Sequence, residues 1–132
     1  IKAMKKVAGS LKLLYSQYRE LQSFAQFGSD LDADTKARLA LGERIVAVLK
    51  QSNNAPVDVT HQICIIYAVV NGYLTKLDVE QIPEFELRLR EFMDNRYEHV
   101  LNAIRETGKL EKDTEDALKA ALSELLTEFT VQ

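Results

Sequence analysis

Histidines and clustered carboxylates are the residues of this chain that could carry metal or acid/base chemistry. The two histidines, His61 and His99, are far apart, and neither has a cysteine or histidine at the spacing of a metal site. We interpret both as surface or helix-capping residues rather than metal ligands. Glu106, Glu111 and Asp113 lie close together, but an acid/base pair needs burial to separate its two pKa values, and the pattern gives no sign of burial. The sequence therefore predicts no catalytic residue and no metal site.

Motifs that cradle phosphates or activate a serine are also missing from the sequence. The chain contains no Gly-x-x-x-x-Gly-Lys-Ser/Thr loop, no Gly-x-Gly-x-x-Gly turn and no nucleophile elbow. The net charge of -3 and the pI near 5.4 argue against nucleic acid as a partner, because neutralising phosphates needs clustered Lys and Arg. We interpret the one basic cluster, formed by Lys2, Lys5 and Lys6, as a solvated helix face.

The apolar run Ile63–Val70 bears on two questions, the redox environment of the chain and its insertion into a membrane. It contains the single cysteine, Cys64, so no intramolecular disulfide can form and a reducing, intracellular setting is expected. The run is far shorter than the roughly 18 to 20 apolar residues that span a bilayer, so no membrane insertion is predicted. The sequence begins at Ile1 without a signal sequence, which suggests a piece of a longer polypeptide.

The elements that must position these residues are predicted to be helices. With 132 residues, 46% hydrophobic and 28% charged, the chain has the size and composition of one globular domain. The first helix is predicted from about Met4 to Ala25, with Gly28 as its stop. Its apolar face alternates three and four steps along Met4, Val7, Leu11, Leu14, Tyr18, Leu21 and Ala25.

A second helix, capped by Asp30 or Asp32, is predicted to continue to about Lys50. Its expected core face is Leu39, Gly42, Ile45, Val46 and Leu49, with Lys36, Arg38, Glu43 and Arg44 mostly outside. The stretch QSNNAPVD, Gln51 to Asp58, is predicted to be a structured loop because it has three amide side chains, a serine and a proline, without apolar periodicity.

The remaining chain predicts a buried central helix and then amphipathic ones. A helix capped by Asp58 is nearly apolar all round through Ile63, Ile66, Tyr67 and Val70, and ends by Gly72 to Leu77. A short turn at Asp78 to Gln81 precedes a helix expected to start at Pro83, to bend near Asn95 and to stop at Gly108. The last helix starts near Asp113, with Leu118, Ala121, Leu122, Leu125, Leu126 and Phe129 on one stripe. The predicted fold class is all-α, five to six helices packed as a bundle within a single domain, 1–132.

Several stretches resemble the alpha subunit of the F-type rotary ATP synthase. They are AMKKVAGSLKL followed by YRELQSFAQFGSDLD, then IIYAVVNGYL at Ile65 to Leu74, and AIRETGKL at Ala103 to Leu110. The order and the spacing also match, so the resemblance covers essentially the whole chain. It implies the C-terminal helical domain of that subunit, in which the nucleotide-binding domain precedes Ile1. ATP or ADP and Mg would then belong to the parent subunit, and the domain by itself would have no cofactor and no ATPase activity.

The resemblance also implies partners and two sites. The partners are the beta subunits, the gamma subunit of the central stalk and the rest of the same alpha chain, in a head peripheral to the energy-coupling membrane. The loop after the first long helix faces the rotating stalk in this family, as the counterpart of the acidic DELSEED loop of the beta subunit. Ser29, Asp30, Leu31 and Asp32 are therefore candidate rotor-facing residues. A glycine stop at Gly28 and an aspartate cap would hold at the same time.

The second implied site lies beside the adenine of the nucleotide bound by the alpha subunit. Gln51 and Pro56 match the family's loop, whereas Asn53 stands where the family usually has a second Gln. The shorter Asn53 keeps the amide donors and acceptor but reaches less far. Pro83 and the segment DNRYEHV, 94–100, also depart from the family's commoner wording, which affects helix boundaries more than function.

These observations favour a mechanical and interaction domain of the alpha/beta ring that couples rotation of the stalk to ATP synthesis or hydrolysis. An alternative is a freestanding helical adaptor that binds one partner helix in an apolar groove. A small hydrolase ranks last, because no spacing of carboxylates supports it.

Overall fold

A computed structural model describes residues 2–25, 33–54, 59–75 and 77–131, with side chains for all of these except 24, 25, 51–54, 130 and 131. Within this part the chain is helical with short turns and has no strand, which confirms the predicted all-α fold. The helices are α1 (Lys2–Ala25), α2 (Ala33–Asn54), α3 (Val59–Val70), the short 3-10 helix η1 (Val79–Gln81), α4 (Ile82–Arg96), α5 (Glu98–Thr107) and α6 (Lys112–Val131).

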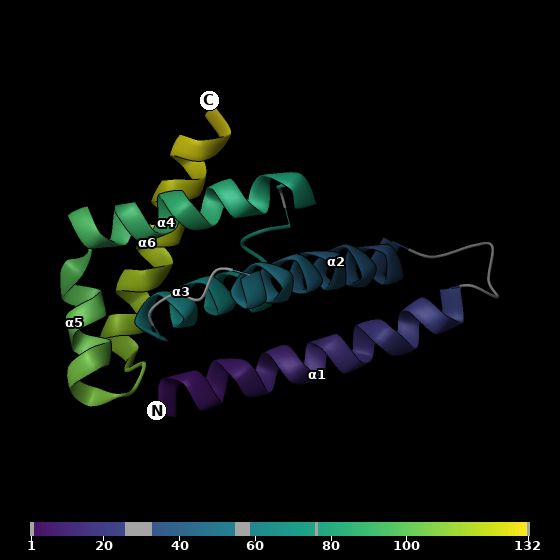
Figure 1. The fold of residues 1–132 in the computed structure, drawn as a ribbon, viewed down its shortest axis with the longest axis horizontal. Helices are drawn as coiled ribbons and strands as arrows, with labels where there is room; N and C mark the ends of the chain where they lie inside the picture. The colour runs from purple at the N-terminus through teal and green to yellow at the C-terminus, as the bar shows by residue number, and fades with distance from the viewer. Residues whose placement is uncertain (1, 26–32, 55–58, 76, 132) are drawn as a thin grey trace.

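Two groups of helices meet at α3. Helices α1, α2 and α3 pack against one another, as do α4, α5 and α6, and α3 also contacts α4 and α5 (Figure 1). The predicted central helix is confirmed, since the residues from Ile63 to Val69 are all buried. A helix that is apolar all round can only be stable where neighbours cover every side of it.

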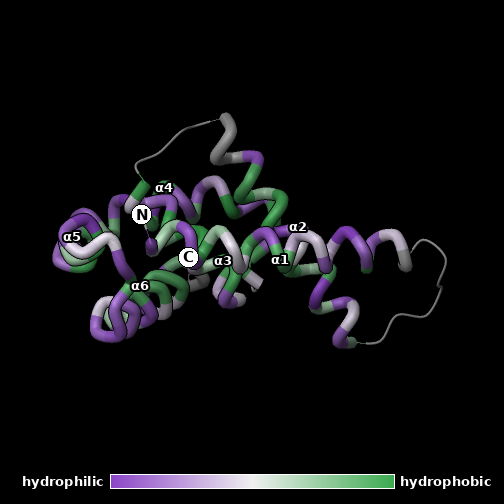
Figure 2. The backbone as a smooth tube through the Cα atoms, turned by 90° about the horizontal axis from the view of Figure 1, so that it is seen from below, coloured by the Kyte–Doolittle hydropathy of each residue, from purple (hydrophilic) through white to green (hydrophobic). Residues whose placement is uncertain are grey.

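The second group is built on the predicted apolar stripes. Phe85 of α4 is fully buried and meets Phe129 of α6 edge to face, with ring centroids 5.6 Å apart. Helix α5 ends at Gly108 in the left-handed conformation (φ 67°), as predicted. The carbonyl of Gly108 accepts the N–H of Ala3 at 2.9 Å and so fastens the end of α5 to the start of α1. Figure 2 shows hydrophobic residues along the inner sides of α3 and α6.

Some predicted boundaries and faces need correction. Helix α2 continues to Asn54 rather than ending at Lys50, so the first half of the predicted loop is helical. Gln is a good helix former, and the restriction imposed by Pro56 falls on the residue before it. Val48, which was not expected in the core, is fully buried, whereas Leu39, Val46 and Leu49 are only partly buried.

The start of α4 is also slightly different from the prediction. The short turn is the helix η1, where the N–H of Asp78 donates to Oε1 of Gln81 at 2.9 Å. Helix α4 then begins at Ile82, with Pro83 in its first turn, where a missing N–H costs little. The expected bend near Asn95 is the break between α4 and α5 at Tyr97.

Candidate functional site

Helices α1 and α2 form an antiparallel arm. Figure 1 shows that α1 ends and α2 begins at the same end of the molecule, away from α4, α5 and α6. The candidate rotor-facing residues Ser29, Asp30, Leu31 and Asp32 connect the two helices but lie outside the described residues. Their role stays a prediction, and what the structure adds is the arm that carries them.

Close packing of Tyr18 on Gly42 holds the middle of this arm together. A Cβ atom built on Gly42 would overlap the ring of Tyr18, so glycine is required for the two helices to approach this closely. Beside this contact lies a groove of about 360 Å³ lined by Gln17, Leu21, Arg38 and their neighbours. The close approach of the two helices at this point therefore depends on glycine at position 42.

Arg44 fastens the arm to the rest of the domain. Its guanidinium donates to the carbonyl of Leu77 through Nε at 3.1 Å and Nη2 at 2.7 Å, and to the carbonyl of Ala40 through Nη1 at 2.9 Å. The side chain is only 13% exposed, so the expectation that Arg44 lies mostly outside is wrong. Helical periodicity places it on the polar flank, and only the fold brings Leu77 within reach.

Gln51 and Asn53 belong to the last turns of α2. Their side chains are not among those the structure describes, so the adenine-side role of both residues stays a prediction. The prediction that both residues lie on a loop is wrong, because α2 extends through them.

The histidines have structural surroundings. His61 is 13% exposed and lies 2.9 Å from Oδ1 of Asp94, which joins α3 to α4. It is therefore mostly buried, and the interpretation of a surface or capping residue does not hold for it. His99 is exposed and its ring lies 5.8 Å from that of Tyr97, in agreement with a surface position. The part of the chain that the structure describes contains no group of His, Cys, Asp and Glu suited to a metal ion.

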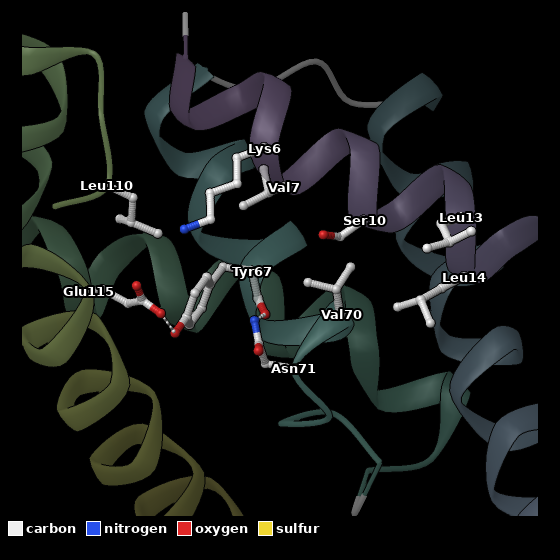
Figure 3. Close-up of a pocket in the computed structure, with 10 residues that line it drawn as sticks. All are labelled: Lys6, Val7, Ser10, Leu13, Leu14, Tyr67, Val70, Asn71, Leu110 and Glu115. Atoms are coloured by element: carbon white, nitrogen blue, oxygen red, sulfur yellow. Dashed lines mark hydrogen bonds between the residues drawn. The ribbon is translucent and has the colours of Figure 1, made fainter. Parts of the chain in front are cut away.

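A pocket of about 300 Å³ opens where α1, α3 and the start of α6 meet (Figure 3). At one end, Tyr67 donates its hydroxyl to Oε1 of Glu115 at 2.9 Å. Burial and this hydrogen bond raise the pKa of Tyr67, so the hydroxyl stays protonated. Leu13 and Leu14 form the other end in Figure 3. The sequence pattern did not indicate this pocket, because its walls come from segments far apart in the chain.

Glu86 on α4 is a half-buried carboxylate that the sequence pattern did not single out. Its burial raises its pKa to about 7, while the nearby charge of Arg90 acts in the opposite direction. Cys64 is buried as predicted, and desolvation raises the pKa of its thiol to about 12. Such a thiol is not reactive at neutral pH.

Comparison with known proteins assigns the helical fold to a family. The family described as "ATP synthase alpha/beta chain, C terminal domain" matches residues 1–125. The chain belongs to this family. Its similarity extends to named relatives, each aligned over 98% of this chain: the mitochondrial ATP synthase subunit alpha of Schizosaccharomyces pombe (47% identical), and ATP synthase subunit alpha of Syntrophomonas wolfei (48%) and of Lactobacillus acidophilus (50%).

The relatives are much longer than this chain. The aligned part is 24% of the yeast protein, 26% of the Syntrophomonas protein and 25% of the Lactobacillus protein. The chain thus spans about a quarter of the length of the curated relatives it matches and corresponds to an ATP synthase C-terminal domain. Among the described residues, no helix is both long enough and apolar enough to cross a bilayer.

Proposed function

We propose that this chain acts as the C-terminal domain of the alpha subunit in a rotary ATP synthase. The observation that carries the proposal is the family match over residues 1–125, together with similarity to alpha subunits over nearly the whole chain. In this role the domain helps to hold alternating alpha and beta subunits in a ring around the gamma subunit of the central stalk. The head lies peripheral to the energy-coupling membrane.

The α1–α2 arm is the part that meets the stalk in this proposal. The segment from Gly28 to Asp32 joins the two helices, whose ends lie together at one extremity of the domain (Figure 1). A contact contributes to coupling only if its free energy differs among rotor angles, since a contact that is equal in all states shifts none of them. The body of the domain serves as the support against which the arm is held.

The coupling role is tested in the full-length subunit, reconstituted with its partner subunits in sealed vesicles. Asp30→Asn together with Asp32→Asn removes two charges and keeps side chains that cap helices almost as well. We expect normal assembly and ATP hydrolysis, with fewer protons pumped per ATP hydrolysed. The matched control is Asp113→Asn with Asp116→Asn, which removes two exposed charges from α6. An unchanged pumping ratio in the first variant would exclude a role of these charges in coupling.

The domain by itself is proposed to lack nucleotide chemistry. ATP or ADP and Mg would be bound by the rest of the subunit, with Gln51 and Asn53 offering at most an adenine-side contact. Calorimetry on the 132-residue chain should therefore show no ATP binding at micromolar concentration, with or without Mg. Tight, magnesium-dependent binding would overturn this part of the proposal.

A further inference from the structure

The exposed side of α1 has an unusual distribution of charge. Lys2, Lys5, Lys6 and Lys12 are all exposed, and the helix has no acidic residue before Glu20, in a chain whose net charge is -3. Within the part of the chain that the structure describes, the side chains of these four lysines form no ion pair or hydrogen bond. The first half of α1 is therefore a basic strip on an acidic protein.

An exposed apolar side chain, Leu13, lies on the same face as this basic strip. Leu13 is 60% exposed and lies two turns after Lys6 on the helix, at the rim of the pocket between α1 and α3. Figure 3 shows Leu13 and Leu14 at one end, with Val70 between them and Tyr67, while Glu115 lies at the opposite end. The pocket has the volume of a small ligand site but is only partly enclosed, which suits an inserted side chain better than a fully enclosed small molecule.

The polar groups of the pocket are divided in a way that favours a carboxylate near α1. Lys6 and Ser10 present donors from α1, and neither has a partner in the described structure. The carboxylate of Glu115 is already engaged by the hydroxyl of Tyr67 at 2.9 Å and by Lys119 at 3.9 Å. An incoming anion would therefore be attracted to Lys6 and Ser10 on α1 rather than to the part of the pocket occupied by Glu115, the one carboxylate among the described residues that line it.

Gly9 makes the same strip accessible to another backbone. It lies one turn before Leu13, and a Cβ atom built on it would contact nothing within 4 Å. Glycine inside an exposed helix costs about 0.5–1 kcal/mol relative to alanine. None of the residues that the structure describes requires it, but the absence of a side chain would let a partner helix approach closely.

We infer that the face formed by Lys5, Lys6, Gly9, Lys12 and Leu13 docks an acidic helical segment of another protein chain. One apolar side chain of that segment enters the pocket between Leu13, Leu14 and Val70, and its carboxylates pair with Lys5, Lys6 and Lys12. Charge complementarity with the basic strip decides for an acidic partner, and the open space over Gly9 accommodates the close approach of a helix backbone. The inference rests on the proposed function, because the partner is expected within the assembled ATP synthase head.

Site-specific photo-cross-linking in the full-length subunit, within the assembled head, tests this docking face. The probe is Leu13→p-benzoylphenylalanine, and the matched control is Leu87→p-benzoylphenylalanine, because Leu87 is 54% exposed but does not line this pocket. We expect position 13 to capture a peptide of another subunit that contains several Asp or Glu residues, and position 87 not to capture it. Ser10 serves as a second incorporation site if the change at position 13 prevents assembly.

Charge reversal then distinguishes docking from mere proximity. Lys6→Glu should lower the yield of the cross-link roughly fivefold, as expected for the loss of one exposed ion pair. Raising the salt concentration should lower the yield of the unchanged protein as well. Lys36→Glu on α2 is the control, since Lys36 is exposed but lies off this face.

The outcomes separate this inference from the proposed function. If the subunit assembles into no ATP-hydrolysing head, the proposed function fails. If the head assembles and hydrolyses ATP, but position 13 captures no other chain or captures a segment without carboxylates, the docking inference alone is wrong. A cross-link that is insensitive to Lys6→Glu also overturns it.

Discussion

The outer half of the α1–α2 arm and the body around α3 are built in different ways. In the body, buried apolar side chains come from every helix, and Ile63, Phe85, Leu101 and Leu122 are almost completely inaccessible. In the arm, among the residues whose burial is described, Leu11 is the last buried one of α1 and Gly42 the first of α2. Beyond these points the described side chains are at most partly buried.

This difference assigns different tasks to the two regions. A close-packed body resists deformation, because interiors of this density transmit strain rather than absorb it. The outer arm is held mainly by contacts between its own two helices, such as that of Tyr18 on Gly42. A force that a partner applies to the outer arm would therefore be transmitted through α1 and α2 to the close-packed body.

Phe85→Ala should produce the largest loss of stability, because it removes a fully buried ring that packs on Phe129. We expect the free energy of unfolding to fall by about 3–5 kcal/mol, measured by urea denaturation of the chain followed by circular dichroism. The comparison variant in the outer arm is Leu21→Ala, which removes a partly buried side chain and should cost clearly less. Equal losses would mean that the arm is as tightly packed as the body.

Gly42→Ala tests the close contact of Tyr18 with Gly42 in the arm. The added methyl group overlaps the ring of Tyr18, so the helices must separate, and we expect a loss of about 1–3 kcal/mol in the same assay. The matched control is Gly9→Ala, where the methyl group meets open space and helix propensity should raise stability by roughly 0.5–1 kcal/mol. If both substitutions were stabilising, the arm would not depend on this contact.

Arg44→Met tests the fastening of the arm to the body. The change keeps much of the apolar stem but leaves the carbonyl of Leu77 without the two hydrogen bonds from Arg44, which should cost about 1–2 kcal/mol. The control, Arg38→Met on the same helix, breaks an exposed pair with Asp34 and should cost less than about 0.5 kcal/mol. A cost of similar size for both variants would show that the buried position of Arg44 has no energetic consequence.

The sequence predicted best those features that depend on one helix alone, such as its buried side and its end. The apolar stripes predicted the buried sides of α3, α4, α5 and α6, and glycine chemistry predicted the end of α5 at Gly108. The partnership of His61 with Asp94 was not predicted, because it joins two residues 33 positions apart on different helices. The position of Arg44 was mispredicted for the same reason.

The same contrast, between features of single segments and features that depend on the whole fold, applies to the candidate site. The resemblance of short motifs indicated the family, and the comparisons confirmed it. The pocket of Figure 3 had no signal in the sequence, since its shape depends on how α1, α3 and α6 are placed relative to one another. Periodicity identifies the buried side of a helix but not the residues that meet at its edges.

Glu86 offers a test of the body that depends on pH and has the smallest expected effect. Burial raises the pKa of its carboxyl from an ordinary value near 4.5 to about 7. Between these two values the folded protein binds more protons at this site than the unfolded chain does. The contribution of Glu86 to stability is therefore favourable at low pH and is lost as the pH rises through about 7.

Glu86→Gln should remove this dependence, because glutamine resembles the protonated acid and does not titrate. The variant should gain stability relative to the unchanged chain as the pH rises from 4.5 to 8. We expect a gain of about 1 kcal/mol, since solvent reaches part of this half-buried group and weakens the effect. Glu91→Gln on the same helix is the control, because Glu91 is exposed. If the difference in unfolding free energy between Glu86→Gln and the unchanged chain stayed constant with pH, Glu86 would be hydrated like a surface residue. Helix α4 would then pack less closely at Glu86 than at Phe85 and Leu89 on either side of it.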